Sequence, residues 1–170
     1  MEPNYYIAEC RHGRGLFSAR RFSKGETILT FHGREISFAE AVAKGDRESD
    51  PMQIGDELYL DIDFPGVLVN HSCEPNCGID SAMAPWSLVA INEIEPDTEF
   101  LYDYSTTMNE KYWTMKCDCQ SDRCRRIVGD FCDLPPETIQ RYTELCIVPN
   151  FILSILRNSQ DQDQKIAKAG

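Results

Sequence analysis

The sequence predicts a mainly β fold built from short strands, followed by a helical segment at the C-terminal end. Glycines at positions 13, 15, 25 and 33 separate short apolar stretches near the start of the chain, as turns separate short strands. Residues 57–64 alternate acidic and apolar side chains at a period of two, which is typical of a half-buried strand. After Leu134 the spacing of the apolar residues becomes helical.

The first elements are expected between residues 5 and 55. Short strands are predicted at the apolar stretches 5–8, 16–17 and 27–31. Ser37 and Glu40 have the spacing of a capping box, so one short helix is predicted to begin there and to end by Gly45. The polar residues 45–55 predict a loop.

Further sheet segments are predicted at 57–64, 86–91 and 99–104. Pro135, Pro136 and Glu137 are typical of a helix start, since proline is tolerated in the first turn, and the helix is expected to reach Cys146. Pro149 separates it from the apolar residues 151–156, which are expected to pack against the body of the protein.

Composition and charge narrow the class of protein. A length of 170 residues with 42% hydrophobic side chains is enough for one domain with a substantial core. The 28 acidic and 17 basic residues give a net charge of −11, which repels a phosphate backbone, so direct nucleic-acid binding is not expected. The chain has no signal-peptide pattern and no apolar stretch of about 18 residues, which predicts a soluble intracellular protein, cytoplasmic or nuclear, without a membrane partner.

Three of the eight cysteines form a compact motif. Cys117, Cys119 and Cys124 have a spacing that suits a structural zinc site, but tetrahedral zinc needs a fourth ligand. The remaining candidates are spread along the chain: Cys10, Cys73, Cys77 and Cys132. A distant fourth ligand would connect this segment to the body of the protein through the metal.

Three other motifs precede this cysteine trio. They are Gly13-Arg14-Gly15, then Asn70-His71-Ser72-Cys73-Glu74-Pro75-Asn76, then Tyr102-Asp103-Tyr104. Each motif alone has an ordinary structural interpretation, such as a turn, a capped loop or the edge of a core. In this order and with these spacings, residues 5–129 resemble the SET-domain protein-lysine methyltransferases that carry a post-SET zinc-binding segment.

The resemblance implies the fold and its division. The expected architecture is the SET fold, or β-clip, of small curved sheets in which the Asn70 and Tyr104 segments thread together in a knot-like arrangement. It implies a SET domain at 5–116, a post-SET zinc segment at 117–133, a helical C-terminal extension at 134–157 and a disordered tail at 158–170. The extension is expected to cover one side of the cleft or to form a dimer contact, so the protein is expected to be a monomer or a homodimer.

The resemblance also implies a site and a reaction. S-adenosylmethionine is expected to bind beside Arg14, Gly15, Leu16, Phe17, Asn70, His71 and Tyr104. Zn²⁺ is expected to be held by Cys73, Cys117, Cys119 and Cys124. The implied reaction is methylation of a lysine side chain in a histone or another basic, lysine-containing protein or peptide, a class of substrate that the acidic composition would attract.

Two tyrosines are the catalytic candidates. Tyr104 matches the essential tyrosine of the family. Tyr102 matches the position at which a tyrosine favours monomethylation, because its hydroxyl can hold a water molecule where another methyl group would go. Phe31 stands where a second active-site tyrosine is common. The alternative is a catalytically weak, SET-like binding or adaptor module that contains zinc.

Overall fold

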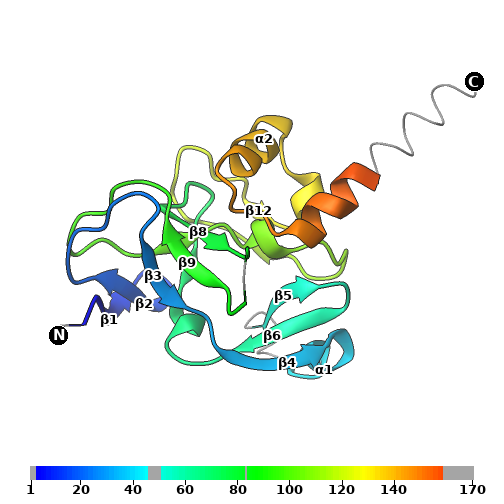
Figure 1. Ribbon diagram of the computed structural model, residues 1–170, viewed down its shortest axis with the longest axis horizontal. Helices are drawn as coiled ribbons and strands as arrows, with labels where there is room; N and C mark the ends of the chain where they lie inside the picture. Colours follow the sequence, from blue (N-terminus) through cyan, green and yellow to red (C-terminus); the bar gives the residue numbers. More distant parts are fainter. Residues whose placement is uncertain (1–2, 46–50, 83, 159–170) are drawn as a thin grey trace, which may run out of the picture.

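The computed structural model describes residues 3–45, 51–82 and 84–158, and within these ranges the fold is mainly β. The larger sheets lie beside one another in the lower and left parts of Figure 1, with α2 above them. A two-stranded sheet pairs β1 (Tyr5–Cys10) with β2 (Gly13–Ser18). In one three-stranded sheet the strand order is β3 (Thr27–Thr30), β9 (Ser87–Ala90), β8 (Cys77–Asp80). In the other, the order is β4 (Gly33–Ser37), β6 (Leu58–Ile62), β5 (Pro51–Gly55).

The two smallest sheets carry sequence motifs. Strand β7 (Asn70–His71) pairs in parallel with β10 (Leu101–Tyr102), so that Asn70 lies opposite Leu101 and His71 opposite Tyr102. Strand β11 (Met115–Lys116) pairs with β12 (Ile127–Val128) and closes the loop that contains the cysteine trio. The pairing of β7 with β10 brings into contact two motifs whose paired residues are 31 positions apart in the sequence.

Short helices connect these sheets. Helix α1 (Phe38–Val42) begins with the predicted capping box, because the Ser37 and Glu40 side chains each accept from the other's backbone N–H group. Turns of 3₁₀ helix occupy η2 (Gly66–Leu68), η3 (Tyr104–Thr107) and η4 (Phe131–Asp133). Helix α2 (Pro136–Glu144) starts at the predicted prolines.

Two local predictions were wrong. Residues 51–55, predicted as loop, form the edge strand β5, because pairing with β6 satisfies their backbone and buries Met52 and Gln53. The Gln53 side chain also accepts from the Asn109 N–H group at 2.8 Å. The strand predicted at 99–104 is limited to residues 101–102, because the Asp103 side chain accepts from the Ser105 N–H group and starts η3.

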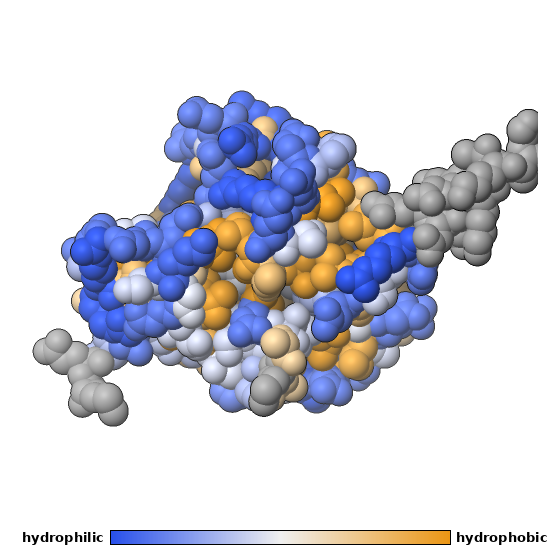
Figure 2. All heavy atoms as spheres, turned by 45° about the horizontal axis from the view of Figure 1, so that its top comes forward, coloured by the Kyte–Doolittle hydropathy of each residue, from blue (hydrophilic) through white to orange (hydrophobic). Residues whose placement is uncertain are grey.

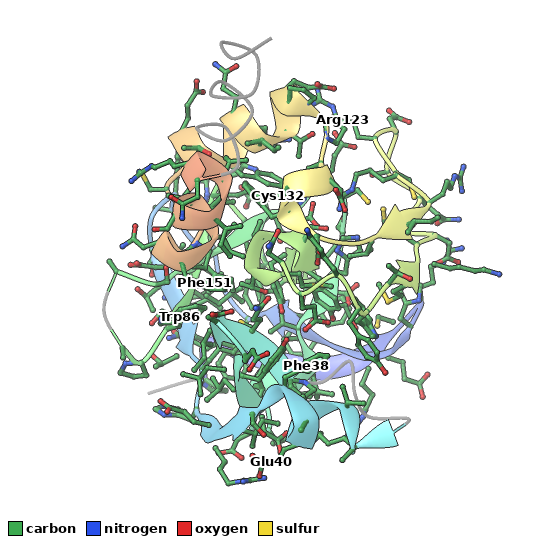
Figure 3. All side chains as sticks on the ribbon, turned by 90° about the vertical axis from the view of Figure 1, so that its right-hand side faces the viewer. Phe38, Glu40, Trp86, Arg123, Cys132 and Phe151 are labelled. Carbon is green, nitrogen blue, oxygen red and sulfur yellow. The ribbon has the colours of Figure 1, made fainter. Side chains whose placement is uncertain are left out.

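The C-terminal extension shares a core with the sheets. Residues 150–158 are helical and, with α2, bury a cluster that includes Ile91, Phe131, Tyr142, Ile147 and Ile152. The prediction that residues 151–156 pack against the body is therefore confirmed, and Figure 3 shows Phe151 beside Trp86, with ring centroids 6.4 Å apart. Figure 2 shows apolar side chains across the middle of one face, between hydrophilic margins.

Two further expectations concern the ends and helices of the chain. The tail predicted at 158–170 lies, apart from residue 158, outside the described residues. Within the part of the chain that the structure describes, none of the helices combines the length and the apolar character needed to cross a membrane.

Candidate active site and metal centre

Four cysteines converge on one point in the described part of the chain. The Sγ atoms of Cys73, Cys117, Cys119 and Cys124 all lie within 4.8 Å of one another. The separations from Cys117 to Cys73 and to Cys124 are both 3.8 Å. Four thiolates that surround zinc tetrahedrally at about 2.3 Å are themselves about 3.8 Å apart, so this donor set fits a structural zinc ion.

The fourth ligand left open by the spacing of the cysteines is therefore Cys73. It lies just after β7, whereas the other three lie in the loop between β11 and β12. The Cys117 N–H group donates to the Arg126 carbonyl at 2.8 Å, which closes that loop. Cys77, by contrast, is fully buried in the main core, and burial raises the pKa of its thiol, so it remains a structural cysteine.

Asn70 connects the metal-bearing segment to the glycine turn of β2. Its amide nitrogen donates to the Arg14 carbonyl at 3.1 Å and to a Glu99 carboxylate oxygen at 2.8 Å. Gly15 permits this approach, because a Cβ atom there would lie 2.3 Å from the same Glu99 oxygen. Leu16 is fully buried in the core, so a ligand at this turn would meet its main chain rather than its side chain.

His71 lies between Tyr104 and the metal centre. Its Nδ1 atom accepts from the Tyr104 N–H group at 3.2 Å, and its Nε2 atom is 3.4 Å from Cys73 Sγ. Burial lowers the pKa of His71 to about 4, so the ring is neutral at pH 7. With Nδ1 as an acceptor, the single ring proton lies on Nε2, facing the Cys73 sulfur.

The two candidate tyrosines pack against each other. Their ring centroids are 4.8 Å apart, and the Tyr104 hydroxyl donates to the Val69 carbonyl at 2.9 Å. Tyr102 is buried, which raises the pKa of its phenol. Phe31 packs at 6.5 Å from Tyr102, between centroids. The site thus contains two adjacent phenols, and the hydroxyl of Tyr104 has a fixed direction.

Two cavities meet at these residues. The larger, of about 330 Å³, is walled by aromatic side chains that include Phe38, Tyr59, Tyr102, Tyr112 and Trp113. The smaller, of about 160 Å³, is lined by His71 and by the cysteine loop through Cys117, Asp118 and Cys119. Four residues line both cavities: His12, Asn70, Tyr104 and Met115. Asn70 and Tyr104 therefore stand in a common wall.

A family model of the SET domain matches residues 13–105, more than half of the chain. The chain belongs to the SET-domain family. This SET domain contains the glycine turn, β7, β10 and Cys73, whereas the cysteine trio and the C-terminal extension follow the matched region. The predicted boundaries of the post-SET segment and of the extension stay predictions.

Several curated relatives resemble this SET-domain chain over 69% of its length. It is 29% identical over 132 residues to human histone-lysine N-methyltransferase 2B, of which it covers 5%. It is 30% identical over 132 residues to histone-lysine N-methyltransferase trithorax of Drosophila virilis, of which it covers 3%, and 28% identical over 134 residues to histone-lysine N-methyltransferase ash1 of Drosophila melanogaster, of which it covers 6%. The chain thus spans only a small part of each of these relatives.

The structure brings most of the predicted site residues of the SET domain together, with two differences. Neither cavity is lined by Arg14, Gly15, Leu16 or Phe17. The Arg14 carbonyl accepts from the Asn70 amide, and Phe17 stacks on Tyr6. Conversely, His12 lines both cavities and lies 3.4 Å from Asp118 of the cysteine loop, although sequence reasoning gave it no role. It directly precedes the glycine motif at 13–15 without being part of it, so only its position in space identifies it.

Proposed function

We propose that this SET domain transfers a methyl group from S-adenosylmethionine to a lysine side chain in a histone or another basic protein. The observation that carries the proposal is the common wall of the two cavities, which contains Asn70 and Tyr104. The names of the curated relatives, histone-lysine N-methyltransferases, support the same reaction and substrate class. A histone substrate implies a nuclear location.

We assign the smaller cavity to the cofactor and the larger one to the lysine. Bound S-adenosylmethionine supplies an electrophilic methyl group on a positively charged sulfur. Asn70 and His71, which line this cavity, are assigned to its polar groups. Arg14, Gly15, Leu16 and Phe17 line neither cavity, so they are assigned to the cofactor on the resemblance to the family and would meet, through the main chain of the turn, a part of it that extends past Asn70. The four cysteines, with bound zinc, hold one wall of this cavity through Cys117 and Cys119.

The larger cavity has to favour the uncharged form of lysine. At a reference pKa of about 10.4, formation of the neutral amine at pH 7.4 costs about 4 kcal/mol. Aromatic walls such as the buried Tyr102 and the partly buried Trp113 disfavour the ammonium form. Bound S-adenosylmethionine would supply its methyl group to the lone pair of a neutral lysine nitrogen held at the common wall, beside Asn70 and Tyr104. The Val69 carbonyl orients the Tyr104 hydroxyl at this junction, and alignment of the reactants contributes on the order of 7–11 kcal/mol.

The proposal is tested by methyl transfer from radiolabelled S-adenosylmethionine. The zinc-loaded chain is incubated with core histones, with a set of lysine-containing basic peptides, and with the same peptides carrying arginine in place of each lysine. Label is expected in the lysine peptides alone. Binding of zinc and peptide without any transfer would instead support the binding-module alternative.

Tyr102→Phe is expected to shift the product from monomethyl-lysine toward dimethyl- and trimethyl-lysine. The Tyr102 side chain lines the larger cavity and its ring packs on Tyr104, so loss of the hydroxyl gives space to a further methyl group while the ring contacts remain. Mass spectrometry of one peptide over a time course measures the product distribution. A predominantly trimethylated product from the unaltered protein would contradict the monomethylation proposal.

Glu110→Gln is expected to raise KM about tenfold for peptides with a second basic side chain near the lysine, with little change in kcat. Glu110 supplies the one carboxylate among the described residues that line the larger cavity. Its carboxylate accepts from the Tyr59 hydroxyl and from the main-chain N–H group of Trp113. A charge-assisted hydrogen bond to a substrate cation is worth roughly 1.5–3 kcal/mol. Peptides with an uncharged neighbour are the control, and an equal loss for both peptide sets would show that Glu110 does not select charge.

A further inference from the structure

A buried ion pair lies directly behind the site. Arg125 donates two parallel hydrogen bonds to the Asp103 carboxylate, at 2.7 and 2.8 Å. The Asp103 side chain is 0% exposed and that of Arg125 is 14% exposed. Removal of two charges from water is costly, so such a pair is stable only when its geometry is good and its remaining valences are satisfied.

The Asp103 carboxylate has further partners. It accepts from the Tyr142 hydroxyl at 2.9 Å and from the Ser105 N–H group at 3.2 Å, while His71 Nδ1 lies 3.5 Å away. Tyr142 is itself fully buried, in the cluster that joins α2 to the sheets. One carboxylate therefore receives donors from three separate segments of the chain.

These partners stand next to the working parts of the site. Asp103 directly precedes Tyr104, and Arg125 directly follows the zinc ligand Cys124. The main-chain N–H group of Arg125 also donates to Cys73 Sγ at 3.5 Å, and the Tyr142 hydroxyl lies 3.5 Å from the Cys73 carbonyl. The three residues thus connect the tyrosine segment, to which Asp103 belongs, with the cysteine loop, to which Arg125 belongs, and Arg125 and Tyr142 also contact Cys73.

We propose that Asp103, Arg125 and Tyr142 form a positioning unit through which the C-terminal extension holds the zinc loop and Tyr104 in register. The unit makes the extension a part of the site rather than a neighbouring helix pair. Its effect on turnover rests on the proposed methyl transfer, whereas its effect on zinc retention does not. Arg125→Lys would keep the positive charge but remove the planar guanidinium group that donates two hydrogen bonds to one carboxylate.

Arg125→Lys and Arg123→Lys make a matched pair, because the two arginines flank Cys124. Arg123 has a side chain that is 64% exposed and is 3.7 Å from Glu74, and it lies near the margin of the molecule in Figure 3. The rate of zinc release to a chromogenic chelator is measured at a temperature below the melting temperature of every variant. Arg125→Lys is expected to release zinc about tenfold faster than the unaltered chain and to bind S-adenosylmethionine about tenfold more weakly, whereas Arg123→Lys is expected to match the unaltered chain.

Tyr142→Phe tests the contribution of the extension with the ring left in the core. We expect zinc release to become roughly threefold faster and kcat to fall about threefold, with KM for the peptide unchanged. Tyr6→Phe is the control, because it removes a hydroxyl that donates to Asp97 at an exposed site. A purely structural role would lower the melting temperature without changing zinc release or kcat.

The outcomes separate the two proposals. If Arg125→Lys and Tyr142→Phe both release zinc at the rate of the unaltered chain, the positioning unit is refuted, whatever the melting temperatures. If the unaltered, zinc-loaded chain neither binds S-adenosylmethionine nor transfers methyl groups, the proposed function fails. The zinc measurements still decide whether the unit exists in that case.

Discussion

Tyr104→Phe is expected to lower kcat by roughly 100-fold or more, with little change in the melting temperature. The ring remains packed between Tyr102 and His71, and the loss of one hydrogen bond to Val69 costs only about 1 kcal/mol of stability. A pre-oriented polar group at the reacting atoms is worth about 100- to 1,000-fold in rate where such groups have been removed from other enzymes. Steady-state kinetics with a labelled peptide measure the loss.

Tyr6→Phe serves as the control for this prediction as well. It removes an exposed tyrosine hydroxyl and keeps the ring that stacks on Phe17, so its kcat is expected to equal that of the unaltered chain. Turnover by Tyr104→Phe at the unaltered rate would remove Tyr104 from the mechanism and would leave the common wall of the cavities without a chemical role.

Removal of zinc is expected to abolish detectable binding of S-adenosylmethionine while most of the β structure persists. Cys117 and Cys119 line the smaller cavity, and their loop is joined to the SET domain through Cys73. Structural zinc sites contribute about 10–16 kcal/mol to the order of the segment that they hold, so the loop is expected to leave the cavity wall without the metal. Chelation and Cys73→Ser should have the same effect.

Metal analysis, circular dichroism and calorimetric titration with S-adenosylmethionine measure the three parts of this prediction. Cys146→Ser is the matched control, because Cys146 is exposed and lies outside the cluster. It is expected to keep zinc and cofactor binding. Unchanged affinity for S-adenosylmethionine in the metal-free protein would contradict the proposed role of the cysteine loop.

Local patterns predicted the elements whose structure is determined by neighbouring residues. The capping box of Ser37 and Glu40 starts α1. Strand β6 lies within residues 57–64, where acidic and apolar side chains alternate. Strand β5 was not predicted, because it is stabilised by pairing with β6 and by the hydrogen bond from the Asn109 N–H group to Gln53, both of which depend on distant residues.

The site shows the same division. The spacing of the cysteines alone left the fourth ligand open, whereas the order of the motifs, through the resemblance to the family, identified Asn70, Tyr104 and all four cysteines, and the fold brings Cys73 to the other three. His12 and Glu110 had no sequence signal, since neither belongs to one of the motifs, although both side chains line a cavity. The bond from Tyr142 to Asp103 joins positions 39 residues apart, and no periodicity or spacing predicts such a contact.

The shared core of the extension limits where the chain can be divided. Ile91, inside the region that matches the family, packs with Phe131, Tyr142 and Ile147. The Ile147 side chain also packs directly on Gly78, since a Cβ atom at position 78 would lie 2.3 Å from Ile147 Cγ2. A shortened recombinant fragment that stopped after Cys124, the last cysteine of the cluster, would lose Phe131, Tyr142 and Ile147, would expose Ile91 and should aggregate. The smallest fragment that can be purified in stable form therefore has to continue through Ile152.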